Sequence, residues 1–161
     1  MICSQAPPSK DPVRTDSRLS RMLHVLVHMD RHEQRATSES IGRMLGTNAA
    51  VVRRTLAGLR EQGIVAAERG PGGGWTLARE LSQISLLDVY QASGTTTLFT
   101  IGVADRTPDC LVEQSVNTML ESTLEDAEAA ILARFASIRL SDIAADFDRR
   151  MRAGGGWMHD L

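Results

Sequence analysis

The chain has 161 residues, of which 42% are hydrophobic and 24% are charged, and its formal net charge is -2 at neutral pH. This length suffices for one core, or for one small domain with a dimerisation arm. No run approaches the roughly eighteen apolar residues of a membrane span, and residues 1–13 lack the apolar core of a signal peptide. Two distant cysteines, Cys3 and Cys110, give no disulfide framework. We therefore expect a cytoplasmic protein without a membrane partner.

The charged residues are divided unevenly along the chain. Residues 14–79 hold eleven arginines and six acidic residues, a net charge of about +5. Residues 80–161 hold six arginines and thirteen acidic residues, a net charge of about -7. A basic first half followed by an acidic remainder is typical of a DNA-binding domain joined to a separate dimerisation or sensor segment.

The first predicted helix begins near Thr15 or Asp16, and its apolar residues recur at helical spacing. These residues are Leu19, Met22, Leu23, Leu26 and Met29. A neighbouring stripe carries His24, His28 and His32, but no further ligand is aimed at them. We therefore expect a solvated histidine stripe and no metal site.

A helix-turn-helix pattern follows. Thr37 is the predicted N-cap of a short helix, Gly46 ends that helix, and Asn48 caps a second helix that Gly63 closes. The first of these helices has its apolar residues at Ile41, Met44 and Leu45, and the second at Ala49, Val52, Leu56 and Leu59. Two helices joined by a tight glycine-containing turn are typical of DNA-binding proteins.

Residues 64–67 and 75–77 are the predicted strands of a β-hairpin, joined by a glycine-rich turn at residues 70–74. Glycines adopt positive φ and let the backbone approach another surface closely. The hairpin follows the second helix of the pattern directly, which is the order of a winged helix-turn-helix. The alternative interpretation is an ordinary surface turn with an incidental arginine, Arg69.

The apolar stripe of the second helix leaves an outward face that carries Arg53 and Arg54, with small Ala50 and Ala57 beside them. Arginine and asparagine suit base edges, arginines also bind phosphates, and small residues let a helix lie deep in a major groove. The alternative is a solvated face. Arg69 at the wing tip could enter a minor groove. The complete set of predicted DNA-binding residues is Thr37, Ser38, Asn48, Ala50, Val51, Arg53, Arg54, Arg69, Gly70, Gly72 and Gly73.

Beyond the wing, Ser85 caps a short helix and a linker begins at Ser93. Apolar residues at helical spacing over residues 109–138 predict a long amphipathic helix of about 45 Å. A small winged domain cannot cover so long a helix, so we expect it to pack against a second chain. A final helix is predicted from Ser141 and Asp142.

These observations divide the chain into five parts. They are a mobile tail at 1–13, a winged helix-turn-helix domain at 14–92, a linker at 93–108, dimerisation or sensor helices at 109–152, and a mobile tail at 153–161. The predicted fold class is mainly α with a small β-hairpin wing and a long C-terminal dimerisation helix. A homodimer places two DNA-contacting helices about one DNA turn apart and requires a pseudo-palindromic operator in double-stranded DNA.

Cys110 is the candidate sensor. It opens the predicted long helix, where backbone N–H groups favour a thiolate, whereas Asp109 and Glu113 oppose one by repulsion. An accessible thiolate could be oxidised, with Cys3 as a possible second thiol, and so change the dimer. The alternative is a half-buried cysteine without a sensing role.

Four segments together resemble the IscR/NsrR/CymR family of bacterial winged-helix regulators. They are residues 37–41 (TSESI), 59–65 (LREQGIV), 69–78 (RGPGGGWTLA) and 84–89 (ISLLDV). The resemblance implies a homodimeric transcription repressor, with the helix after Asn48 in the major groove and Arg69 in the minor groove. It also implies a long helix that crosses the dimer.

Several members of that family bind an iron-sulfur cluster through three closely spaced cysteines, which this chain lacks. A cluster needs roughly three or four protein ligands, so we expect no cofactor. Residues 107–113 (TPDCLVE), with a single cysteine, are most similar to the cluster-free YwnA-like branch.

Other functions have less support in the sequence. It contains no phosphate-binding Gly-x-x-x-x-Gly-Lys motif and no nucleophile elbow, so we do not expect an enzyme. The alternative function is a winged-helix protein-protein adaptor that does not bind DNA. The sequence does not identify the effector or the operator.

Overall fold

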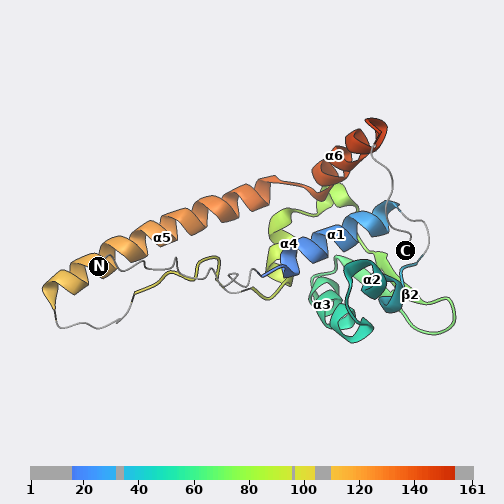
Figure 1. Cartoon of the computed structure of the whole chain (residues 1–161), viewed down its shortest axis with the longest axis horizontal. Helices are drawn as coiled ribbons and strands as arrows, with labels where there is room; N and C mark the ends of the chain where they lie inside the picture. Colours follow the sequence, from blue (N-terminus) through green and yellow to red (C-terminus); the bar gives the residue numbers. More distant parts are fainter. Residues whose placement is uncertain (1–15, 32–34, 96, 104–109, 155–161) are drawn as a thin grey trace, which may run out of the picture.

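The computed structural model describes residues 16–31, 35–95, 97–103 and 110–154, and these form a mainly helical fold with one two-stranded hairpin (Figure 1). The elements in chain order are α1 Arg18–Arg31, α2 Ser38–Leu45, α3 Ala49–Glu61, β1 Val65–Glu68, β2 Gly74–Leu77, the 3-10 helix η1 Leu81–Gln83, α4 Leu86–Ala92, α5 Leu111–Ser137 and α6 Leu140–Arg152. The predicted fold class is confirmed.

One apolar core holds the winged domain together. Helices α1, α2, α3 and α4 and the base of the hairpin all contribute side chains that are almost completely buried. The largest are Met22, Leu26, Ile41, Leu56, Leu59, Ile64 and Ile84. Leu140 and Ala144 of α6 are buried in the same core, so the C-terminal helix packs on the winged domain.

Side-chain caps begin three of the helices at the predicted residues. The N–H of Ser40 donates to Oγ1 of Thr37 at 3.0 Å, and the N–H of Val51 donates to Oδ1 of Asn48 at 3.0 Å. Ser85 and Asp88 form a reciprocal capping box at the start of α4. Such caps satisfy backbone donors that have no partner within the helix.

Some element bounds differ from the sequence-based expectation. Helix α1 begins at Arg18, because Asp16 accepts a hydrogen bond from the N–H of Arg18 ahead of the first turn. Helix α6 begins at Leu140, one residue before the predicted Ser141, and its Asp142 side chain accepts from the N–H of Arg139. Both shifts fall within the usual uncertainty of helix ends.

Helix α5 extends from the winged domain as a long arm (Figure 1). Its 27 residues correspond to about 40 Å at 1.5 Å per residue. Apolar residues occur on several sides along its length, so α5 as a whole is only weakly amphipathic, contrary to the expectation. Of the helices in the described part of the chain, none is long and apolar enough to cross a membrane.

The base of the arm is joined to the winged domain by backbone hydrogen bonds. The N–H of Leu86 donates to the carbonyl of Ile138 at 2.9 Å, and the N–H of Leu140 donates to the carbonyl of Ile84 at 3.0 Å. The rings of Tyr90 and Phe135 meet edge to face, with centroids 5.7 Å apart. The C-terminal end of α5 is therefore fixed next to α4.

Several predictions fall outside the described residues. They concern the tail at 1–13 with Cys3, the histidine His32, Asp109 and most of the second tail. Residues 104–108 of the predicted linker also lie there. The predicted domain boundaries therefore stay predictions.

Candidate nucleic-acid interface

A tight turn sets the direction of α3 relative to α2. Gly46 has φ of +62°, a conformation that suits glycine, and it ends α2. A side chain at Gly42 would bring a Cβ to 2.8 Å from the carbonyl oxygen of Thr47. The glycines at both positions thus allow the two helices to approach each other closely.

The outward face of α3 carries the predicted side chains. Ala50, Arg53 and Arg54 are exposed, and Val51 is half-buried. The side chain of Asn48 caps the helix, so that its Oδ1 is already bound to the N–H of Val51. Arg53 and Arg54 are the exposed charged residues in the first half of α3.

A groove of about 500 Å³ lies between α3, the start of α2 and the hairpin. Three arginines line it: Arg53 and Arg60 from α3, and Arg69 from the wing. Thr37, Ser38, Gly70 and Gly73 line it as well. The groove brings together residues that lie more than thirty positions apart in sequence, and it contains most of the predicted DNA-binding set.

Arg54 points to a different place. It lines a second hollow between α1, α3 and α4, together with Arg18 and residues 91–94. The guanidinium of Arg18 donates to the carbonyl of Ser93 and is paired with Asp16 at 2.6 Å. The two neighbouring arginines of α3 therefore face different sides of the helix.

Two acidic residues also line the groove, and each is paired with an arginine. Arg53 binds the Glu39 carboxylate at 2.7 Å, and Arg35 forms an ion pair with Glu68. The Arg35 guanidinium beside Glu68 holds the pKa of that carboxyl below its usual value. All four side chains are exposed, so each pair contributes little to stability and can be exchanged for another partner.

Ser38 differs from the rest of the predicted set. Its side chain is buried, and its Oγ accepts a hydrogen bond from Nε1 of Trp75 at 3.0 Å. Only its backbone N–H, in the first turn of α2, is suitably placed for an external acceptor. Because Trp75 covers the hydroxyl, the prediction that Ser38 contacts DNA now concerns its backbone and stays a prediction.

The wing turn is built from glycine. Gly70 has φ of +97° and Gly72 has φ of +76°, and both are open to solvent. The N–H of Gly73 donates to the carbonyl of Gly70 at 2.9 Å, which closes the turn. A Cβ at Gly73 would lie 2.5 Å from the carbonyl oxygen of Glu68. Glycine is therefore required at Gly73 by packing and at the other two positions by φ.

Arg60 was not among the predicted DNA-binding residues, although it lines the groove. The spacing of Arg60 from Arg53 in the sequence could have identified it. Arg53, Ala57 and Arg60 are separated by four and three residues and share one side of a helix. The predicted set of DNA-binding residues on this helix ended at Arg54, whereas Arg60 lies in the last turn of α3, which ends at Glu61.

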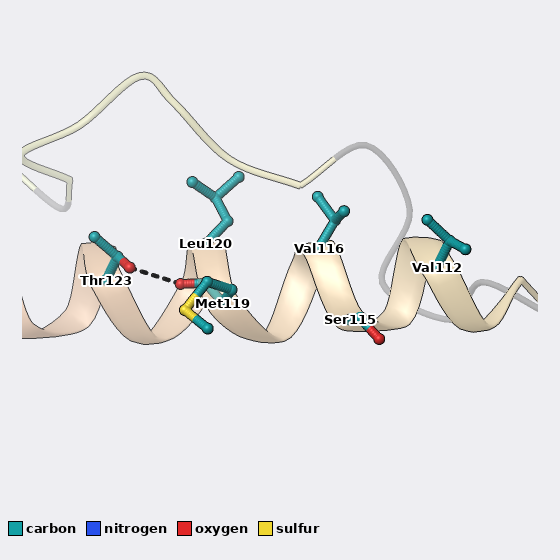
Figure 2. A pocket seen from close by; sticks show the side chains of 6 residues that line it. All are labelled: Val112, Ser115, Val116, Met119, Leu120 and Thr123. Carbon is teal, nitrogen blue, oxygen red and sulfur yellow. Dashed lines mark hydrogen bonds between the residues drawn. The ribbon is translucent and has the colours of Figure 1, made fainter.

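The first half of α5 exposes an apolar face (Figure 2). Val112 is 72% exposed and Met119 is 70% exposed, unusually large values for such side chains. The face is lined by Val112, Ser115, Val116, Met119, Leu120 and Thr123. In Figure 2 the Thr123 hydroxyl turns back to the Met119 carbonyl, so it adds no free polar group to the face.

Cys110 precedes α5 and is fully exposed. The backbone N–H groups of Glu113 and Val112, in the first turn of the helix, hold the pKa of its thiol below the usual value. This agrees with the expected effect of a helix N-terminus on a thiol. In the single chain Cys110 is thus exposed and not half-buried, as the alternative interpretation had it, and its sensing role stays a prediction.

Comparisons with known proteins agree with this geometry. A family model named Rrf2, described as an iron-dependent transcriptional regulator, matches residues 15–146. YwnA of Bacillus subtilis (strain 168), assigned as an HTH-type transcriptional regulator, is 31% identical over 131 residues, which cover 80% of this chain and 95% of YwnA.

Solved structures match with similar coverage. A protein solved as a DNA-binding protein is 30% identical with a TM-score of 0.62, over 79% of this chain and 98% of the other. IscR of T. potens has 20% identity and a TM-score of 0.63, over 91% and 95% of the two chains. At that identity the likeness to IscR shows the fold alone.

The thiols of this chain do not fit an iron-sulfur cluster. The sequence contains two cysteines, and a cluster needs roughly three or four protein ligands. Within the described residues, no group of three or more His, Cys, Asp or Glu side chains converges on one point. Among the described residues Cys110 is the one cysteine, too few thiolates for such a cluster.

Proposed function

Because the chain belongs to the Rrf2 family of transcriptional regulators, we propose that this DNA-binding regulator acts as a homodimeric repressor in the cytoplasm. The observation that carries the proposal is the groove between α3 and the wing, where Arg53, Arg60 and Arg69 converge. Three cations from two elements provide the electrostatic attraction that a DNA backbone requires.

In the proposed complex, α3 enters the major groove and the wing tip enters the adjacent minor groove. The sugar-phosphate backbone between the two grooves then passes through the groove of the protein. Arg53 and Arg60 bind its phosphates, and Arg53 exchanges Glu39 for DNA. Arg69, on a turn of small residues, can reach the floor of a narrow minor groove.

Dimerisation is proposed through the apolar face of α5. Three large apolar side chains of this face are more than half exposed in the single chain: Val112, Val116 and Met119. Contiguous exposed apolar surface of this kind marks interaction sites. A second copy supplies the same face, as the two-fold symmetry of a homodimer requires. The dimer then presents two α3 helices to a pseudo-palindromic operator.

The proposed repressor has two versions that differ in the role of Cys110. In the first version, oxidation of the exposed thiolate to a sulfenic acid changes the start of α5 and releases DNA. The oxidant is a peroxide, which is reduced to water or an alcohol as the sulfur gains one oxygen. In the second version the thiol is inert and another effector controls the dimer.

Fluorescence anisotropy on DNA from the protein's own promoter tests the proposal. The titration is repeated at several salt concentrations, after mild peroxide treatment, and with Cys110→Ser. We expect specific binding that weakens steeply with salt. Binding lost on oxidation in the native chain but retained in Cys110→Ser establishes the thiol switch.

Other outcomes lead to different conclusions. Binding that is indifferent to peroxide in both proteins leaves a DNA-binding dimer with a different effector. Absence of binding, or binding that hardly depends on salt or sequence, contradicts the repressor. Such a result would favour the protein-protein adaptor, although the relatives of this chain are transcriptional regulators.

A further inference from the structure

The wing hairpin is attached, near its turn, to the segment that leads into α2. Ala36 and Trp75 form an isolated antiparallel bridge, in which each N–H donates to the other carbonyl, at 3.1 and 2.8 Å. In Figure 1 the hairpin lies beside α2 accordingly. The bridge extends the two-stranded sheet by one short backbone contact.

Side chains reinforce the same junction. Nε1 of Trp75 donates to Oγ of Ser38 at 3.0 Å, and both residues are buried, at 8% and 7% exposure. A Cβ at Gly74 would lie 2.9 Å from the carbonyl oxygen of Ala36, so only glycine permits this approach. The Arg35–Glu68 ion pair joins the same two segments at the surface. The wing is thus held at both strands.

A buried hydrogen bond is directional, and it is far less exchangeable than the exposed ion pair. The hydrogen bond of Trp75 therefore orients β2 relative to α2. Because the tight turn fixes α2 relative to α3, it also orients β2 relative to α3. The wing tip carries Arg69 only one residue beyond the end of β1. A small rotation of the hairpin at this attachment therefore changes the position of Arg69.

We infer that Ser38 and Trp75 are positioning residues, which set the angle between the wing and α3 so that Arg69 enters the minor groove while Arg53 binds the adjacent phosphates. The inference rests on the proposed DNA-binding mode and assigns the buried pair a task in it. Neither side chain needs to touch DNA. Substitutions of Ser38 or Trp75 should then affect DNA binding only when the Arg69 side chain is present.

A double-mutant cycle measures that dependence. Trp75→Phe removes the indole donor and keeps an aromatic ring in the core, and Ser38→Ala removes the acceptor and keeps the tryptophan. Each is combined with Arg69→Ala, and operator affinity is measured by anisotropy. Circular dichroism checks that each variant is folded. If one of the two single variants does not fold, the cycle with the other one tests the inference.

We expect each single variant to weaken binding by about threefold or more, and the loss to vanish once Arg69 is already alanine. Ser40→Ala is the matched control, because Ser40 is a buried serine of the same helix whose hydroxyl donates to the carbonyl of Thr37, away from the wing. Its effect should be equal in the presence and absence of the Arg69 side chain. Additive losses for Trp75→Phe or Ser38→Ala would overturn the inference.

A second measurement needs no DNA. Residual dipolar couplings of backbone amides give the direction of the wing relative to α3 in the free full-length protein. We expect the wing amides of Trp75→Phe to change direction while those of α2 and α3 agree with the native protein. An unchanged direction would overturn the positioning role, even if the native chain binds DNA as proposed. Failure of the native chain to bind DNA instead rejects the proposed function, and the couplings still decide the angle.

Discussion

Gly58 provides a quantitative test of how closely α3 packs on α4. A Cβ at this position would lie 2.2 Å from the carbonyl oxygen of Ala92 and 3.3 Å from its carbonyl carbon. Ordinary contacts begin near 3.4 Å, so Gly58→Ala requires one helix to move by more than about 1 Å. The atoms in the way belong to the backbone and cannot rotate aside.

Two effects of Gly58→Ala oppose each other. Alanine in place of glycine within a helix stabilises by about 1 kcal/mol. Overpacking costs about 1–3 kcal/mol, and the rigid partner favours the upper part of that range. We therefore expect a net loss of about 1–2 kcal/mol, or a decrease in Tm of roughly 2–8 °C for a chain of this size. Displacement of α3 should also weaken operator binding.

Urea unfolding at fixed protein concentration measures this loss, since the stability of the proposed dimer would depend on concentration. Ala57→Gly is the matched control, because it changes helix propensity in the same turn without adding atoms. We expect it to cost about 1 kcal/mol through propensity. If Gly58→Ala is neutral or stabilising by about 1 kcal/mol, the propensity effect dominates and the close α3–α4 contact is refuted.

Four further predictions concern the groove, the arm and the thiol. Arg69→Ala should weaken operator binding by about 1–3 kcal/mol in anisotropy titrations, and unchanged affinity at physiological salt would reject the minor-groove contact. Arg60→Ala should reduce the slope of log affinity against log salt by about 1, whereas an unchanged slope would show that Arg60 binds no phosphate. Val116→Glu should shift the dimer toward monomer in analytical ultracentrifugation, because it buries a charge in the apolar face. Thr118→Glu, which adds the same charge on the other side of α5, should remain dimeric; if both variants behave alike, the face is not the interface. The Cys110 thiol should react with iodoacetamide at lower pH than an ordinary cysteine, because its lowered pKa populates the thiolate earlier, and a normal pH profile would contradict this.

The local features of this fold could be predicted from sequence, because they depend on neighbouring residues. Thr37, Asn48 and Ser85 cap helices where side-chain oxygens can reach N–H groups three positions ahead. Gly46 and Gly63 end helices with positive φ, as expected for residues without a Cβ. Periodicity likewise identified the buried residues of α3, but in α1 it missed the buried Val25 and Val27.

The candidate site was predictable only in part, because its remaining contacts join distant segments. The burial of Ser38 depends on Trp75, thirty-seven positions away. The pairing of Arg53 with Glu39, and the divergence of Arg54 toward α1, follow from the packing of α3 in three dimensions. Periodicity alone assigns both arginines to one outward face. Helical periodicity does not show which other elements of the fold lie beside that face of α3.

A hydroxyl-radical footprint of the native protein on its own promoter tests the central claim most directly. The account predicts two protected segments related by a dyad and centred about one helical turn apart, with minor-groove protection that Arg69→Ala removes. It also predicts that the protection fades as salt is raised. A promoter cleaved uniformly in the presence of folded protein would contradict the account.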